Sequence, residues 1–150
     1  MKSYFSFFLI LLFLVSCGIG KVEMPKESPE EVVKKFYSFI SQKGKGPSEE
    51  ARKLISKQYG VISEDNFRRW TDQFDPETTI KIIDSKISDK KDKKGNVIAM
   101  VTIEFSTPSI LGDPYKSKSL TNLILDKKEK RWKIDFTAET KDEEAFKREG

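Results

Sequence analysis

Few side chains in this 150-residue sequence are of the types that usually carry out covalent or metal chemistry. Cys17 is the only cysteine, and the sequence contains no histidine. The lack of histidine excludes imidazole acid–base catalysis, Ser-His and Cys-His nucleophile pairs, and histidine-containing metal sites. A single cysteine excludes an intramolecular disulfide. The chemistry that remains for Cys17 is modification of its own thiol, and we expect neither a metal site nor a bound cofactor.

The residues before Cys17 form a short apolar segment with one positive charge at its start. Lys2 precedes an uninterrupted apolar run over 7–15, and small, polar Ser16 separates this run from Cys17. A transmembrane helix needs about 20 apolar residues to cross the hydrocarbon core. The segment is shorter than that, and its length suits the apolar core of a signal peptide.

This pattern resembles a bacterial lipoprotein signal peptide with its lipobox, in which Leu14, Ser16 and Cys17 occupy the expected positions. The resemblance implies that residues 1–16 are removed. It also implies a diacylglycerol on the sulfur of Cys17 and, usually, a fatty acyl group such as palmitate on the new amino terminus. The protein would then be held by this lipid on the periplasmic or surface face of a membrane of the bacterial cell envelope. A secretory signal peptide with ordinary cleavage is the alternative, and inner versus outer membrane stays open.

Residues 17–27 are interpreted as the lipidated cysteine and a short tether, because the stretch is polar, contains glycine and is broken by Pro25. Such a tether would keep the folded domain close to the membrane. The whole chain has a formal net charge of +4, but its lysines and acids are interspersed. This pattern is typical of a solvated surface, so we expect no nucleic-acid binding.

Three helices are predicted in the first half of the domain. Ser28 and Glu31 form a capping box at the start of the first helix, which ends at the glycine- and proline-containing stretch 44–47. The second helix opens near Ser48 and the third at Ser63. Their apolar positions at helical spacing are Val33, Phe36, Phe39 and Ile40, then Ala51, Leu54 and Ile55, then Phe67, Trp70 and Phe74.

The second half of the chain changes to strand periodicity. Strands are predicted over 78–88, 97–105, 117–126 and 131–137, and the stretch 107–116, with two prolines and a glycine, is predicted to be a loop. Short turns between consecutive strands favour an antiparallel meander. The inward positions are predicted to be Val97, Ala99, Val101, Ile103 and Phe105 in the second strand, and Trp132, Ile134 and Phe136 in the fourth.

Helices followed by a meander with one apolar face predict an α+β domain over 28–137, in which the helices pack on a four-stranded antiparallel sheet. A charged tail over 138–150 follows this domain.

Three stretches of this domain carry a second resemblance: SPEEVV at 28–33, FYSFI at 36–40 and RWKIDF at 131–136. Together they look like small bacterial lipoproteins of the NTF2-like (cystatin-like, cone-shaped) superfamily. The resemblance implies a curved sheet wrapped against helices, often with a cavity at the open end of the cone. It also implies a range of functions, from isomerases and dehydratases to non-catalytic binding domains, and frequent dimerisation. A different helix-on-sheet lipoprotein domain with the same pattern is the alternative.

Four residues are candidates for binding a ligand in such a cone: Tyr37, Trp70, Asn122 and Trp132. Each also has a structural interpretation. Tyr37 suits a half-buried helix position with a hydrated hydroxyl, and the two tryptophans suit anchors of the core. Asn122 either lines a cavity or lies on the solvent face of its strand, in which case Leu123 and Leu125 point inward.

The sequence therefore favours a non-catalytic, membrane-anchored module that binds a small apolar ligand or an envelope protein. The alternative is a cavity enzyme, in the style of an isomerase or dehydratase, that uses a buried carboxylate and a tyrosine. No carboxylate can be assigned to such a pocket from spacing alone, so no catalytic residue is proposed. The stretch 107–116, with Ile110, Leu111 and Tyr115, either folds back over the sheet or contacts a partner. Outward-facing Ile98 and Met100 suggest a homodimer through the sheet.

Overall fold

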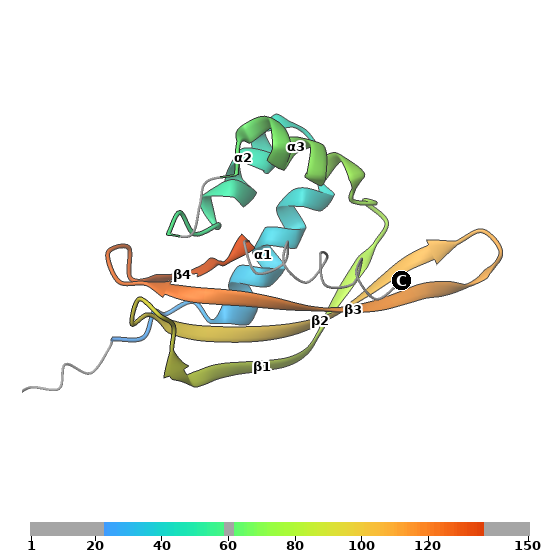
Figure 1. The fold of residues 1–150 in the computed structure, drawn as a ribbon. Coiled ribbons are helices and arrows are strands. Elements are labelled where there is room, and N and C mark those ends of the chain that lie inside the picture. The colour runs from blue at the N-terminus through green and yellow to red at the C-terminus, as the bar shows by residue number, and fades with distance from the viewer. Residues whose placement is uncertain (1–22, 59–61, 137–150) are drawn as a thin grey trace, which may run out of the picture.

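The computed structural model describes residues 23–58 and 62–136. Cys17, the signal segment 1–16, the start of the tether, Tyr59 and the tail 138–150 lie outside the described residues. The described chain forms three helices followed by an open antiparallel sheet with strand order β1-β2-β3-β4, so the α+β prediction is confirmed. The helices cover one face of this sheet (Figure 1). Their bounds are α1 Pro29–Ser41, α2 Lys45–Lys53 and α3 Glu64–Gln73, and those of the strands are β1 Thr79–Lys91, β2 Val97–Ser109, β3 Gly112–Asp126 and β4 Arg131–Ile134.

Helix α1 begins at the predicted capping box. The backbone N–H of Glu31 donates to the Ser28 hydroxyl at 3.3 Å, and the Glu31 carboxylate accepts from the backbone N–H of Ser28 at 2.7 Å. Pro29 occupies the first turn, where its missing N–H costs no helical hydrogen bond. The helix is fixed against the sheet by its buried residues, which are Val32, Val33, Phe36, Tyr37 and Ile40.

We expect Ser28→Ala to lower the free energy of unfolding by about 1 kcal/mol, because the cap to the Glu31 N–H is lost. Urea denaturation followed by circular dichroism measures this loss. Ser38→Ala is the matched control, since Ser38 is exposed in the same helix, and it should change the free energy of unfolding by no more than about 0.5 kcal/mol. Equal effects of the two substitutions would contradict a stabilising role for the cap.

Helix α2 begins earlier than its predicted start near Ser48. Gly44 is its N-cap, with a φ of 93° that favours glycine. Pro47 therefore lies in the first turn, where a proline does not break the helical hydrogen-bond pattern. Helix α3 begins directly after its predicted start at Ser63, which is its N-cap, and the backbone N–H of Asn66 donates to the Ser63 hydroxyl at 3.2 Å.

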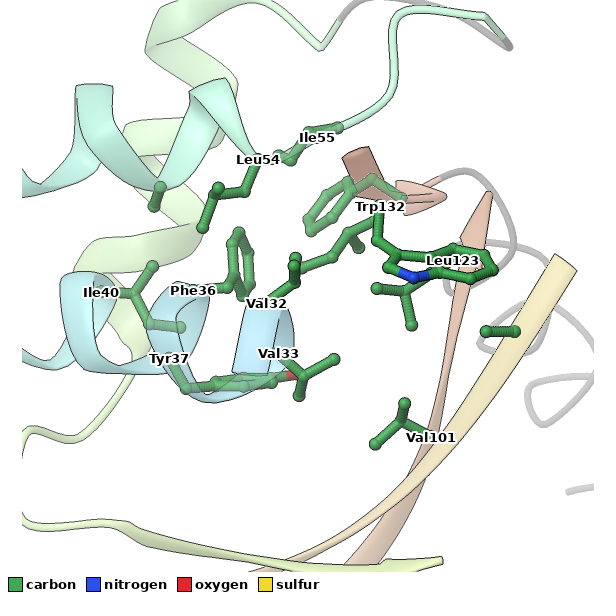
Figure 2. Packing of buried hydrophobic residues seen from close by; sticks show 14 of the residues in the cluster. Val32, Val33, Phe36, Tyr37, Ile40, Leu54, Ile55, Val101, Leu123 and Trp132 are labelled. Atoms are coloured by element: carbon green, nitrogen blue, oxygen red, sulfur yellow. The ribbon is translucent and has the colours of Figure 1, made fainter. Parts of the chain in front are cut away.

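The sheet places the predicted alternating residues of β2 toward the helices. Ala99, Val101 and Ile103 are fully buried, and Val97 and Phe105 pack against the same core. Helix α1 contacts β1, β2 and β4, whereas α2 packs against both α1 and α3. Figure 2 shows the resulting cluster between α1 and the strands, with Leu54 and Ile55 from the end of α2 among its members.

The segment after α2 lies beside β4 and continues the hydrogen bonding at that edge. Ile55 forms a parallel bridge with Ile134, and the backbone N–H of Ile134 donates to the Leu54 carbonyl at 2.8 Å. Lys133, predicted on the face opposite Trp132, is nevertheless buried. Its ammonium group donates to the Lys53 carbonyl at 2.6 Å and pairs with the Glu129 carboxylate at 2.9 Å.

We expect Lys133→Met to lower the free energy of unfolding by about 1–3 kcal/mol, because the partly buried Lys53 carbonyl at the end of α2 loses its donor. Glu129→Gln is the control, since it removes a carboxylate that is roughly half exposed and leaves the Lys53 carbonyl its donor. The loss of this partly exposed ion pair should cost no more than about 1 kcal/mol. Denaturant unfolding of both variants gives the comparison. A loss in Glu129→Gln as large as that in Lys133→Met would show that the ion pair, and not the carbonyl, accounts for the effect.

The prediction of a loop over 107–116 is wrong. Strands β2 and β3 continue through this stretch as a hairpin that extends away from the rest of the domain (Figure 1). Thr107 pairs with Tyr115 and Ser109 with Gly112, so Pro108 lies opposite two residues at a break in the register. A proline cannot donate to a strand ladder, but it is accommodated at such a bulge.

Candidate functional site

Tyr37, a candidate ligand-binding residue, is buried in the domain core. Its ring lies edge-on to Phe36 and Phe105, with centroid distances of 5.3 and 5.2 Å, and 5.8 Å from the ring of Phe74. These contacts place Tyr37 at the junction between α1, α3 and β2. The prediction of a half-buried tyrosine is therefore wrong, because α1 presses this face fully against the sheet.

The two tryptophans occupy different depths of the same core. Trp132 is only 2% exposed and pairs across the strands with Leu125, as expected for a core anchor. Trp70 is partly exposed on α3, stacked on Phe67 with ring centroids 5.8 Å apart and edge-on to Phe136 at 4.9 Å. The inward orientation predicted for Trp132, Ile134 and Phe136 is confirmed by their burial.

Asn122 lies on the face of β3 that points away from the helices. Its neighbours Leu123 and Leu125 belong to the core cluster, and its strand partner is Met100, one of the outward-facing residues of β2. Its backbone carbonyl accepts from the backbone N–H of Asp135 at 2.8 Å. The solvent-face interpretation of Asn122 is therefore correct, and this residue does not share a site with Tyr37.

Two of the described carboxylates, Asp84 and Glu30, do not have the surroundings of a buried general acid. Asp84 is exposed and pairs with Thr102, on the outer face of the sheet. Hydrogen bonds from Ser28 and then Ser85 lower the pKa of the Glu30 carboxyl, which is opposite to the raised pKa that a buried general acid needs. Among residues 23–58 and 62–136, no three Asp, Glu, His or Cys side chains are arranged to hold a metal ion.

A charged hollow lies between α2 and α3. Arg52 of α2 and Glu64 of α3 meet across it at 3.3 Å. The space inside, about 10 Å³, suffices for about one water molecule. Its lining residues carry charges of both signs and the space is small, so it does not suit the small apolar ligand expected from the sequence.

The largest apolar exposure in the described structure is at the tip of the β2–β3 hairpin. Ile110 is 102% exposed and Leu111 is 94% exposed, and Tyr115 lies close behind them at 70%. The backbone N–H of Leu111 donates to the Ser109 hydroxyl at 3.2 Å and so helps to close the turn. Of the two interpretations offered by the sequence, folding back over the sheet is wrong, because these side chains contact no core residue. We take this tip as the candidate functional site.

The outer face of the sheet carries a weaker apolar surface. Ile98 and Met100 are half-buried there, and Leu120, whose partner on β2 is Thr102, is 42% exposed. The homodimer suggested by the sequence would use this face and remains a prediction.

Comparison with protein-family models, with curated proteins and with solved structures finds no match to this chain. None of the described helices is both long enough and apolar enough to cross a membrane.

Proposed function

We propose that this chain is a lipid-anchored protein of the bacterial cell envelope whose folded domain is a non-catalytic interaction module. The lipid anchor is supported by the short apolar run over 7–15, which is followed by Ser16 and the only cysteine, Cys17. The capped start of α1 at Ser28 supports it, because the folded domain begins a short distance after the cysteine. Diacylglycerol on Cys17, with an acyl group on its amino terminus, would supply the two or three chains that stable membrane attachment requires.

A contact role for the domain is supported by the way its interior is filled. The space between α1 and the sheet holds tightly packed aromatic rings, and the three candidates Tyr37, Trp70 and Trp132 all take part in this packing. Tyr37 and Trp132 are buried by these contacts, so neither leaves a face free for a ligand. Exposed apolar groups lie instead at the hairpin tip, which favours an envelope protein over a small apolar ligand.

We further propose that the domain belongs to the NTF2-like superfamily. The support is the order of elements, with a capped helix lying across an antiparallel meander that ends in the RWKIDF stretch at 131–136. This assignment concerns the fold, and it does not by itself supply an activity.

Native mass spectrometry of residues 18–150 tests the contact role against ligand binding. The proposal predicts the mass of the bare polypeptide after gentle purification. A bound mass of a few hundred daltons would contradict a filled interior and would identify the class of ligand. The same spectrum reports whether the domain is a monomer or a dimer.

A further inference from the structure

The hairpin formed by β2 and β3 extends beyond every other described element as a two-stranded ribbon. Strand β1 pairs with β2 only as far as Ser106, and β4 pairs with β3 only from Leu123 onward. The ribbon between these limits is therefore supported at its base alone, where the hydroxyls of Thr78 and Thr107 lie 2.8 Å apart. Figure 1 shows the hairpin end projecting away from all three helices.

The turn at the end of this ribbon lacks the residues that are usual in a hairpin turn. Tight hairpin turns favour Asn, Asp and Gly, yet the two turn residues are Ile110 and Leu111. Neither residue has a positive φ, and the adjoining Gly112, at φ 145°, takes up the unusual backbone conformation. Because both side chains are fully exposed, they contribute nothing to the burial that stabilises the fold. Two residues that are unusual in a hairpin turn and that do not stabilise the fold indicate a functional role for this turn.

The position of the hairpin tip relative to the amino terminus indicates how far the tip lies from the proposed anchor at Cys17. Glu23 pairs with Lys130 at 2.8 Å, so the described chain starts beside the β3–β4 turn. Strand β3 has 15 residues and spans about 50 Å between that turn and the tip, at ~3.3 Å per residue. The stretch from Cys17 to Glu23, which is six residue steps long, reaches about 20 Å at most when fully extended. An anchor at Cys17 therefore lies at the opposite end of the sheet from the tip.

This geometry disfavours insertion of the tip into the membrane that holds the anchor. The tip could reach that membrane only if the whole sheet lay nearly flat on it, because the tether is shorter than β3. In the end of the hairpin, residues 107–116, the charged side chains are Asp113 and Lys116. Their opposite charges cancel, so this segment is not attracted to anionic lipid. Two aliphatic side chains followed by an exposed tyrosine, on a backbone already ordered by strand pairing, instead suit a pocket on a protein.

We infer that Ile110 and Leu111, with Tyr115 behind them, insert into an apolar pocket of a second envelope protein, one that stands away from the anchoring membrane. This inference rests on the proposed anchor at Cys17 for the direction in which the hairpin points. The partner is defined by its chemistry: a preformed apolar pocket that admits two adjacent aliphatic side chains.

In-cell photo-crosslinking of the full, lipidated chain tests the inference. A photoreactive amino acid placed at Asp113, which is exposed beside the tip, leaves Ile110, Leu111 and the Ser109 hydroxyl in place. One placed at Lys93, in the β1–β2 turn at the other end of the sheet, is the positional control. We expect one discrete protein adduct from position 113 and none from position 93. The adduct should fall at least about tenfold in the double variant Ile110→Ser/Leu111→Ser. It should persist in Ile83→Ser, which removes an exposed aliphatic group elsewhere on the sheet.

Three results would overturn the inference: no adduct, an adduct of equal yield in the double variant, or an adduct with lipid alone. Once the crosslinked protein is identified, the two purified proteins should bind with a dissociation constant that the double variant raises at least about tenfold. Membrane retention of the chain, measured in the same cells, reports separately on the anchor. If the chain with an unaltered tip is retained in the membrane but forms no adduct, the partner is refuted, whereas loss of that chain from the membrane fraction refutes the proposed anchor.

Discussion

Replacing Trp132 with alanine is expected to lower the free energy of unfolding by about 3–5 kcal/mol. The indole is 2% exposed, belongs to the core cluster and pairs across the strands with Leu125. Its removal leaves a cavity that the surrounding strand and helix residues cannot fully close. Because a domain of this size is typically stable by about 5–15 kcal/mol, this loss is a large part of its total stability. Denaturant unfolding followed by far-ultraviolet circular dichroism measures the loss.

Tyr115→Ala provides the comparison for Trp132→Ala. Tyr115 is also a large aromatic residue on a strand, but it is 70% exposed, so its loss should cost no more than about 0.5 kcal/mol. A cost below about 1 kcal/mol for Trp132→Ala, or a cost for Tyr115→Ala that matches it, would contradict the assignment of the core to the helix-facing side of the sheet.

Cys17→Ser is expected to move the protein from the membrane fraction to the soluble fraction or to leave the precursor unprocessed. Each buried CH₂ group contributes about 0.8 kcal/mol to membrane attachment, so loss of every acyl chain removes the whole of this stabilisation. Fractionation after an alkaline, detergent-free wash, followed by immunoblotting, measures the change. Ser16→Ala is the matched control, because it keeps a small residue before the cysteine and should remain in the membrane. Retention, after the same wash, of a Cys17→Ser protein from which the signal segment has been removed would contradict the anchor.

The helices and most strands could be predicted because their signals are local. The capping box of Ser28 and Glu31 and the alternation of Ala99, Val101 and Ile103 each depend on a few neighbouring residues. The hairpin end was not predicted, because Pro108 and Gly112 are normally read as loop residues. Only the register with the opposite strand shows that Pro108 falls at a bulge, and register is a property of two segments.

The depths of the candidate ligand-binding residues and of the hairpin tip were harder to predict, because they depend on contacts between separate elements. In β3, Leu120 and Ile124 alternate with Leu123 and Leu125, so spacing alone could not decide which face Asn122 shares. Tyr37 follows directly after Phe36 in α1, and its depth depends on Phe74 and Phe105, which come from other elements. The exposure of Ile110 and Leu111 likewise depends on the ribbon extending past β1, which no local pattern encodes.

The mass of the amino-terminal peptide of the membrane-extracted protein tests the central claim most directly. After proteolysis, the account predicts a peptide that begins at Cys17 and carries the added mass of a diacylglycerol, with or without a further acyl group on its amino terminus. A peptide that begins elsewhere, or a Cys17 peptide with an unmodified thiol, would contradict the lipid anchor and the orientation of the hairpin that is inferred from it.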